Sequence, residues 1–201
     1  MKKEKQKKTP AQEALSWVLT LAAAVVIAMA IRTLVFQPVR VEGASMEHTL
    51  RDGEIMIMTK YDYGSDWLAL PWQDAEAKEN AARFTVGGDP QRFDVVICRY
   101  PRRGDTNFVK RVVGLPGDTV ELRAGYLYVN DVKYDEPYIA DEYRDNEYFG
   151  PYTVPEGCYF VMGDHRNNSN DSRAQGPITR DMIMGHVRCV VFPLGAMRGI
   201  D

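Results

Sequence analysis

The longest apolar run of the chain covers residues 15–36. It carries no charge as far as Ile31 and then continues through Arg32 to Phe36. At about 1.5 Å of rise per residue, a helix of this run extends roughly 33 Å, enough for the ~30 Å hydrocarbon layer of a bilayer. Arg32 lies near one end, from which its long side chain can reach the interface. We therefore expect a transmembrane anchor over residues 14–36.

A removable signal peptide is the alternative interpretation of this run. Ala28-Met29-Ala30 has the small-x-small pattern of a cleavage site. The apolar core is, however, longer than the roughly 7–15 residues usual in such peptides. A retained anchor is the preferred interpretation, and self-cleavage at this site stays open.

After the anchor the hydrophobic period shortens to that of β-strands, in runs bounded by Gly, Pro, Asn and Asp. Many short strands with close turns predict a mainly β body of the barrel-like or sandwich type. Residues 115–118 have Pro and Gly where a type II turn requires them, and Asn130-Asp131 resembles a hairpin loop. The expected strands are Val39–Glu42, Glu54–Met58, Asp94–Tyr100, Asn107–Gly114, Thr119–Arg123, Tyr126–Val129, Val132–Tyr134, Cys158–Met162 and His186–Phe192.

Two stretches interrupt this pattern. Residues 62–92 hold two tryptophans, an Ala/Glu/Lys patch and a Gly-Gly pair, and are expected to form a short helix or loop inserted between strands. Residues 135–157 are rich in Tyr, Asp, Glu and Pro and are expected to form a surface excursion. The predicted organisation is a basic tail over residues 1–13, then the anchor, then a β-rich body over residues 37–201.

Charge changes this picture at the N-terminus. The first ten residues hold five lysines and one glutamate, so the rest of the chain is acidic within the net charge of −3. An acidic body without a basic stripe argues against nucleic acid as a partner. Taken alone, the lysine run is equally compatible with a solvated tail. Before an apolar span it predicts a single-pass protein of the cytoplasmic membrane, with its N-terminus inside and residues beyond about 37 outside.

The three cysteines, Cys98, Cys158 and Cys189, have no CxxC spacing and are odd in number. They indicate neither a zinc site nor a disulfide framework. Buried free thiols are the preferred interpretation, and one disulfide with a spare thiol stays open. The sequence also lacks the P-loop, Rossmann and HExxH motifs, so we expect no cofactor and no metal.

Two segments could carry catalytic chemistry. Ser45 follows an expected strand, and Gly43 and Ala44 keep the approach to its hydroxyl uncrowded. Lys110 lies inside an apolar strand beside Arg111, and strand alternation places the two cations on opposite faces, so one must face the interior or a groove. Desolvation lowers the pKa of a buried lysine, whose neutral amine can then accept a proton from a serine hydroxyl. The alternative, favoured by this strand alone, is that both cations protect a sheet edge.

A third segment, residues 162–173, follows an apolar strand and is almost entirely polar. A surface loop is the simplest interpretation. The segment also offers a hydroxyl that could orient an amine, and Asp and Arg side chains that could pair with each other.

Together the three segments resemble the type I signal peptidases. That family has a Ser-Met box after the anchor, a Lys-Arg-Val-x-Gly-x-Pro-Gly-Asp box, and a Gly-Asp-Asn-Arg box that ends in Ser-x-Asp-Ser-Arg. The resemblance covers the anchor and nearly the whole body, leaving residues 62–92 outside it. It implies a membrane-bound serine endopeptidase that removes signal peptides from secretory preproteins after a small-x-small motif, without a cofactor.

The resemblance also implies roles for individual residues. By position, Ser45 is the nucleophile, Lys110 is the general base, Ser169 hydrogen-bonds the lysine, and Asp171 and Arg173 form a supporting ion pair. The pockets for the substrate's −1 and −3 side chains are lined by Val39, Val41, Met46, Leu50, Phe108 and Val109. The β-rich catalytic body is expected to rest on the outer membrane surface, in contact with lipid.

Three positions depart from the family pattern. His48 stands where the family usually has Pro, His165 replaces the usual Asn, and Gly43 replaces a Ser or Thr that donates to the oxyanion in some members. His48 also raises a Ser–His alternative, which would require a helical turn after Ser45 and has no evident Asp to orient the ring. Two rival functions remain: a soluble self-cleaving repressor of the Ser–Lys type, disfavoured by the anchor, and an inactive membrane-tethered peptide-binding module.

Overall fold

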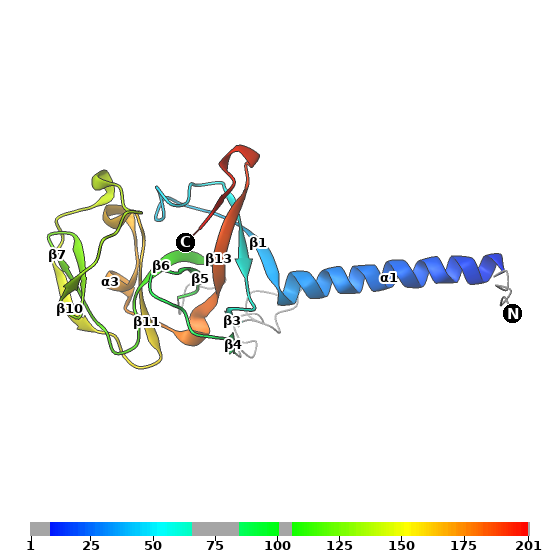
Figure 1. Cartoon of the computed structure of the whole chain (residues 1–201), viewed down its shortest axis with the longest axis horizontal. Helices are drawn as coiled ribbons and strands as arrows, with labels where there is room; N and C mark the ends of the chain where they lie inside the picture. Colours follow the sequence, from blue (N-terminus) through cyan, green and yellow to red (C-terminus); the bar gives the residue numbers. More distant parts are fainter. Residues whose placement is uncertain (1–8, 66–84, 101–105, 201) are drawn as a thin grey trace, which may run out of the picture.

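The computed structural model describes residues 9–65, 85–100 and 106–200. A long helix, α1 (Pro10–Leu34), projects away from a β-rich body that contains the C-terminus (Figure 1). Thr9 caps this helix reciprocally with Gln12, because the Thr9 Oγ1 accepts from the Gln12 N–H and the Gln12 Oε1 accepts from the Thr9 N–H. Pro10 suits the first helical position, where no N–H is needed.

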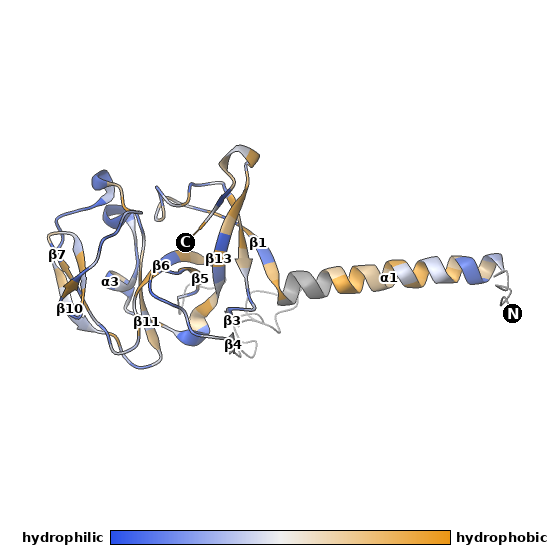
Figure 2. Cartoon of the chain, in the orientation of Figure 1, coloured by the Kyte–Doolittle hydropathy of each residue, from blue (hydrophilic) through white to orange (hydrophobic). Residues whose placement is uncertain are grey.

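The part of α1 that could cross a membrane is Pro10–Ala28, with a mean hydropathy of 1.7 and no part of the window buried in the body. In Figure 2 the middle of the helix is coloured in orange and pale turns, and its N-terminal end includes hydrophilic blue. The helix ends at Leu34 and the next strand begins at Phe36. The last residue of the predicted anchor over 14–36, Phe36, is therefore the first residue of β1.

The largest sheet has eight antiparallel strands and is curled, so the predicted mainly β fold is confirmed. The short β14 (Arg198–Gly199) pairs with β13 off the main path. The other strands in spatial order are β1 (Phe36–Arg40), β2 (Ile55–Thr59), β13 (Ile183–Phe192), β5 (Val95–Cys98), β6 (Phe108–Gly114), β11 (Cys158–Met162) and β12 (Ile178–Thr179).

A second sheet lies at the end of the body away from α1 (Figure 1). It contains β10 (Phe149–Thr153), β7 (Thr119–Arg123), β8 (Tyr126–Val129) and β9 (Val132–Lys133). A hairpin of β3 (Tyr63–Ser65) and β4 (Thr85–Gly87) forms the third sheet. The short helices are η1 (Asp141–Tyr143), η2 (Arg166–Asn168), α3 (Ser172–Gln175), η3 (Arg180–Met182) and η4 (Leu194–Ala196).

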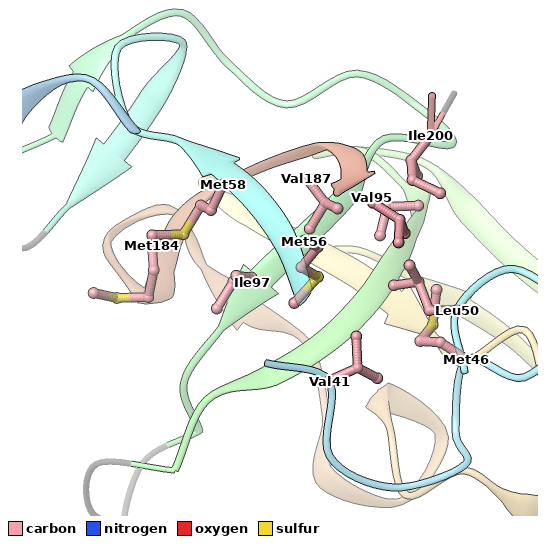
Figure 3. Packing of buried hydrophobic residues seen from close by; sticks show 11 residues of the cluster. Val41, Met46, Leu50, Met56, Met58, Val95, Ile97, Met184, Val187 and Ile200 are labelled. Atoms are coloured by element: carbon pink, nitrogen blue, oxygen red, sulfur yellow. The ribbon is translucent and has the colours of Figure 1, made fainter. Parts of the chain in front are cut away.

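The buried cluster beside β2, β5 and β13 holds the segment that carries Ser45. Figure 3 shows Val41, Met46 and Leu50 reaching toward Met56 and neighbouring core side chains. Leu50 is fully buried and Met46 nearly so. The hydrophobic core therefore anchors the chain on both sides of the Ser45 hydroxyl.

The structure matches β7, β8 and β11 to the residue and differs elsewhere. The first strand is Phe36–Arg40 rather than Val39–Glu42, because its pairing with β2 begins at Phe36 opposite Thr59. The excursion over 135–157 contains β10, which pairs with β7 at the edge of the second sheet. The insert over 62–92 enters and leaves through β3 and β4, and residues 66–84 lie outside the described residues.

The predicted turns have the required backbone conformations. Gly117 has a φ of 83°, as the third position of a type II turn demands. Asn130 and Asp131 have φ values of 52° and 63°, the signature of a type I′ hairpin. Local turn chemistry was thus sufficient to predict these two connections.

Candidate active site

Ser45 lies in a tight turn after β1. The Ala44 carbonyl accepts a hydrogen bond from the Glu47 N–H at 3.0 Å, and the Met46 carbonyl accepts one from the Leu50 N–H at 2.7 Å. The chain is fixed before this turn as well, since the Val41 N–H donates to the Glu54 carbonyl at 2.8 Å. Ser45 itself stays half-buried at the surface of this anchored segment.

Lys110 reaches Ser45 from β6. Its Nζ lies 2.6 Å from the Ser45 Oγ and 3.0 Å from the Val109 carbonyl oxygen. The lysine is 2% exposed, and this burial lowers its pKa although Asp171 and Asp164 act in the opposite direction. A neutral amine in this place can accept the proton of the serine hydroxyl.

Arg111 is buried as well as Lys110. The expectation was that one of the two cations faces the interior or a groove, and the structure buries both. Its guanidinium binds Asp164 through two hydrogen bonds of 3.0 and 2.9 Å and lies over the Tyr138 ring at 3.8 Å. Thr49 donates to the same carboxylate at 2.5 Å, which ties Arg111 to the Ser45 segment. The edge-strand alternative is wrong, because β6 lies between β5 and β11.

Asp171 and Arg173 form an ion pair of 2.9 Å beside the site. Asp171 also accepts from the Gly163 N–H at 3.0 Å and caps the N-terminus of α3. Burial raises the pKa of this carboxyl, but the hydrogen bonds and charge of Arg173 outweigh burial and lower it overall. The same arginine donates to the Arg166 carbonyl at 2.7 Å, so it holds the polar loop together.

Ser169 does not hydrogen-bond Lys110 in this structure. Its Oγ is buried and has no hydrogen-bond partner of proper geometry among the described residues, although it lies near enough to Asp171 to favour the charged carboxylate. It packs instead against Gly163, where a β-carbon would lie 2.3 Å from the hydroxyl oxygen. Gly163 is a site residue that the sequence analysis missed, since nothing in its box indicated such close contact.

The six expected pocket residues separate into three environments. Val41, Met46 and Leu50 are core side chains rather than open lining. Val39 and Val109 are partly buried against the same cluster. Phe108 packs on another cluster, edge-on to the Tyr100 ring at 5.4 Å.

The three departures from the family pattern have distinct surroundings. His48 has a φ of 79°, which proline cannot adopt, and its Nδ1 contacts the Tyr138 carbonyl at 3.1 Å. The Ser–His alternative is therefore not formed, because Ser45 contacts Lys110 instead. Gly43 has a φ of 88° and donates its N–H to Asp52 at 2.9 Å. His165 contacts the Ala44 carbonyl.

Another buried ionic group was missed by the sequence analysis. Glu136, from the polar excursion, is paired with Arg166 and with Arg144. Tyr138 donates to the same glutamate at 3.1 Å, so the excursion is fastened to the polar loop. The acidic composition of the excursion did not indicate that the Glu136 carboxylate would be buried.

The cysteines are free thiols, as preferred, although Cys158 and Cys189 are only half-buried. Burial raises the pKa of the Cys98 thiol to about 12, so it stays protonated at neutral pH. Within the described parts of the chain, no group of three or more His, Cys, Asp or Glu side chains could hold a metal ion.

Comparisons with known proteins identify the family of the chain. A family model described as signal peptidase, peptidase S26, matches residues 14–192. Signal peptidase I of Bacillus licheniformis is 37% identical over 194 residues, covering 92% of each chain. Signal peptidase I T of Bacillus subtilis is 36% identical over 209 residues, covering 97% of this chain and 94% of the relative. A crystal structure of a signal peptidase I from Enterococcus faecalis, 38% identical, covers 49% of this chain and 97% of that chain with a TM-score of 0.44. The chain therefore belongs to the signal peptidase I family of S26 serine peptidases.

Proposed function

We propose that this protein is a membrane-anchored endopeptidase that removes signal peptides from secretory preproteins after a small-x-small motif, using a Ser45–Lys110 dyad. The observation that carries the proposal is the 2.6 Å contact between the Ser45 Oγ and the buried Lys110 Nζ. Family membership supports the removal of signal peptides.

In the proposed reaction the Ser45 Oγ attacks the scissile carbonyl while the neutral Lys110 Nζ takes its proton. The resulting ammonium group returns this proton to the leaving amine as the peptide bond breaks. Water, deprotonated in turn by Lys110, then hydrolyses the acyl-enzyme and restores the serine. Asp171 and Arg173 hold the polar loop beside the dyad and touch no reacting atom.

An oxyanion donor is also required, and we assign it to the main chain. Gly43 offers no hydroxyl, whereas the Ser45 N–H makes no hydrogen bond to any described residue. Removing one such donor costs about 2.7–4 kcal/mol in other serine peptidases. The Ser45 N–H is therefore free to stabilise the developing charge.

For the membrane, we propose that α1 crosses the bilayer with residues 1–13 inside and the catalytic body, 37–201, outside. The unburied apolar surface of α1 and the lysines before it support this placement. Val39, Phe108 and Val109 are only partly buried, so they are proposed to contact the small side chains of the substrate. Val41, Met46 and Leu50 support these contacts from the core.

The decisive experiment is cleavage of a purified Ala-x-Ala preprotein by the full chain in detergent, with the new N-terminus identified by mass spectrometry. We expect one cut after the second Ala, and none when that residue is replaced by Phe, because a small pocket cannot accept the ring. Ser45→Ala should abolish the cut. A folded Ser45→Ala protein that still cleaves would exclude the proposed nucleophile.

A further inference from the structure

His165 contacts both peptide units that flank the Ser45 α-carbon. Its main-chain N–H donates to the Ser45 carbonyl at 3.1 Å. Its Nδ1 lies 3.0 Å from the Ala44 carbonyl oxygen and 3.0 Å from the Glu47 Oε2. The side chain is 13% exposed, so these contacts are largely shielded from water.

The position of the ring proton follows from these partners. Both atoms near Nδ1 are acceptors, so this nitrogen must carry a hydrogen. The hydrogen is present in the neutral Nδ1–H tautomer and in the imidazolium form alike. This one hydrogen lies between the Ala44 carbonyl and the Glu47 carboxylate, so the contact with Ala44 depends on the Nδ1 donor.

The ring is held in place by the polar excursion. The Tyr143 ring of η1 lies against the imidazole, with 4.0 Å between centroids and 34° between planes. Asn167 of η2 donates to the Glu142 carbonyl at 3.1 Å, which fixes η1 beside the histidine. The excursion thus limits the freedom of the side chain that contacts Ala44.

We propose that His165 is a positioning residue that orients the Ser45 N–H toward the oxyanion; this inference rests on the proposed function. The Ala44 carbonyl and the Ser45 N–H belong to one planar trans peptide, so they point in opposite directions. When His165 holds the carbonyl, it also sets the direction of the N–H. The Ser45 carbonyl, held by the His165 main chain, keeps the next peptide unit from rotating.

Three substitutions separate this role from packing. In His165→Asn the amide nitrogen is bonded to Cγ, as Nδ1 is, so it can donate from the same place, but the ring contact with Tyr143 is lost. In His165→Phe the ring contact remains and the donor is lost. His165→Ala loses both, while the main-chain N–H of residue 165 is present in all three.

The test measures kcat and KM for preprotein cleavage and the Tm of each variant. His165→Phe and His165→Ala should lower kcat roughly tenfold to a hundredfold with little change in KM, because an oxyanion contact acts in the transition state. His165→Asn should stay close to wild type in kcat, even though its Tm falls below that of His165→Phe. The Tm order follows the ring contact and the kcat order follows the donor.

The inference is overturned if His165→Phe keeps wild-type kcat, or if His165→Asn is as slow as His165→Ala. Ser45→Ala, assayed in parallel, distinguishes this failure from that of the proposed function. If Ser45→Ala is inactive and His165→Phe is fully active, only the positioning role of His165 is excluded. If Ser45→Ala is folded and active, Ser45 is excluded as the nucleophile, and the proposed function fails with it.

Discussion

Gly163 lies so close to the Ser45 carbonyl oxygen that a β-carbon at position 163 would approach this oxygen to 2.4 Å. The same β-carbon would lie 2.3 Å from the Ser169 Oγ. One of the contacted atoms is main chain, so the Ser45 turn would have to move to make room. The absence of a side chain at residue 163 is therefore a condition for the observed placement of Ser45.

Gly163→Ala should consequently destabilise the protein by about 1–3 kcal/mol, the usual cost of overpacking. Its kcat should fall about a hundredfold, because a displacement near 1 Å is enough to misplace a nucleophile. Gly195→Ala is the control, since a β-carbon at residue 195 meets no atom within 4 Å. Wild-type kcat in Gly163→Ala, measured on the preprotein, would show that the turn accommodates the methyl group.

Lys110 should determine the pH dependence of cleavage. Because burial lowers its pKa, kcat/KM should rise with pH and level off below the ~10.4 of an ordinary lysine. Lys110→Met should lower kcat by several orders of magnitude, at or beyond the ~10²–10⁴-fold typical of general bases. Lys110→Arg should fail as well, since a guanidinium stays protonated. A pH profile unchanged in a slow, folded Lys110→Met protein would assign the titration to another group.

The free energy of unfolding should also depend on the protonation of Lys110. Between the folded-state pKa of Lys110 and about 10.4, the unfolded chain binds more protons at this residue, so its contribution to the free energy of unfolding rises with pH. Below the folded-state pKa the buried ammonium is present in full and destabilises most. Denaturant unfolding of wild type and Lys110→Met across this range should therefore show a difference that shrinks as pH rises.

Gly43 should tolerate neither Ala nor Ser without cost. Its φ of 88° is a conformation that residues with a β-carbon rarely adopt, although a β-carbon there would meet no atom within 4 Å. We expect both variants to lose about 1 kcal/mol of unfolding free energy. Comparing the kcat of Gly43→Ser with that of Gly43→Ala then isolates the effect of the hydroxyl. Full stability in Gly43→Ala would show that the turn does not need the positive φ.

The orientation in the membrane can be tested in cells stripped of their wall. Protease added from outside should digest the catalytic body and leave the lysine-rich tail protected. Accessible residues restricted to the first ten would mean the opposite orientation. Permeabilised cells, in which both sides are reached, provide the control.

The sequence was most informative where local chemistry decides the structure. The hairpin at Asn130-Asp131 and the strands β7 and β8 follow from turn residues and alternation. The strand β11 follows from a continuous apolar run, which is buried along most of its length. The resemblance pointed to Ser45 and Lys110, but the 2.6 Å contact between them depends on bringing together positions far apart in the chain. A local sequence pattern cannot predict the distance between two atoms that only the tertiary fold brings together.

Other features depended on partners that no local pattern specifies. The strand β10 includes Gly150 and Pro151 and is formed only because β7 offers a pairing edge. Glu136 is buried because Arg166 neutralises it across 30 positions of sequence. The contact of Gly163 with Ser45 arises from the same long-range assembly.

The direct passage from α1 to β1 has a mechanical consequence for the proposed topology. Only Val35 separates the two elements, and its carbonyl accepts from the Lys60 N–H at 2.9 Å, so the joint is fastened to the sheet. Nine residues lead from Phe36 to Ser45, a reach of at most roughly 30 Å even when fully extended. With α1 across the bilayer, the segment from Phe36 to Ser45 limits the distance between the serine and the lipid. A scissile bond held farther from the lipid than this distance could not be reached by the Ser45 hydroxyl.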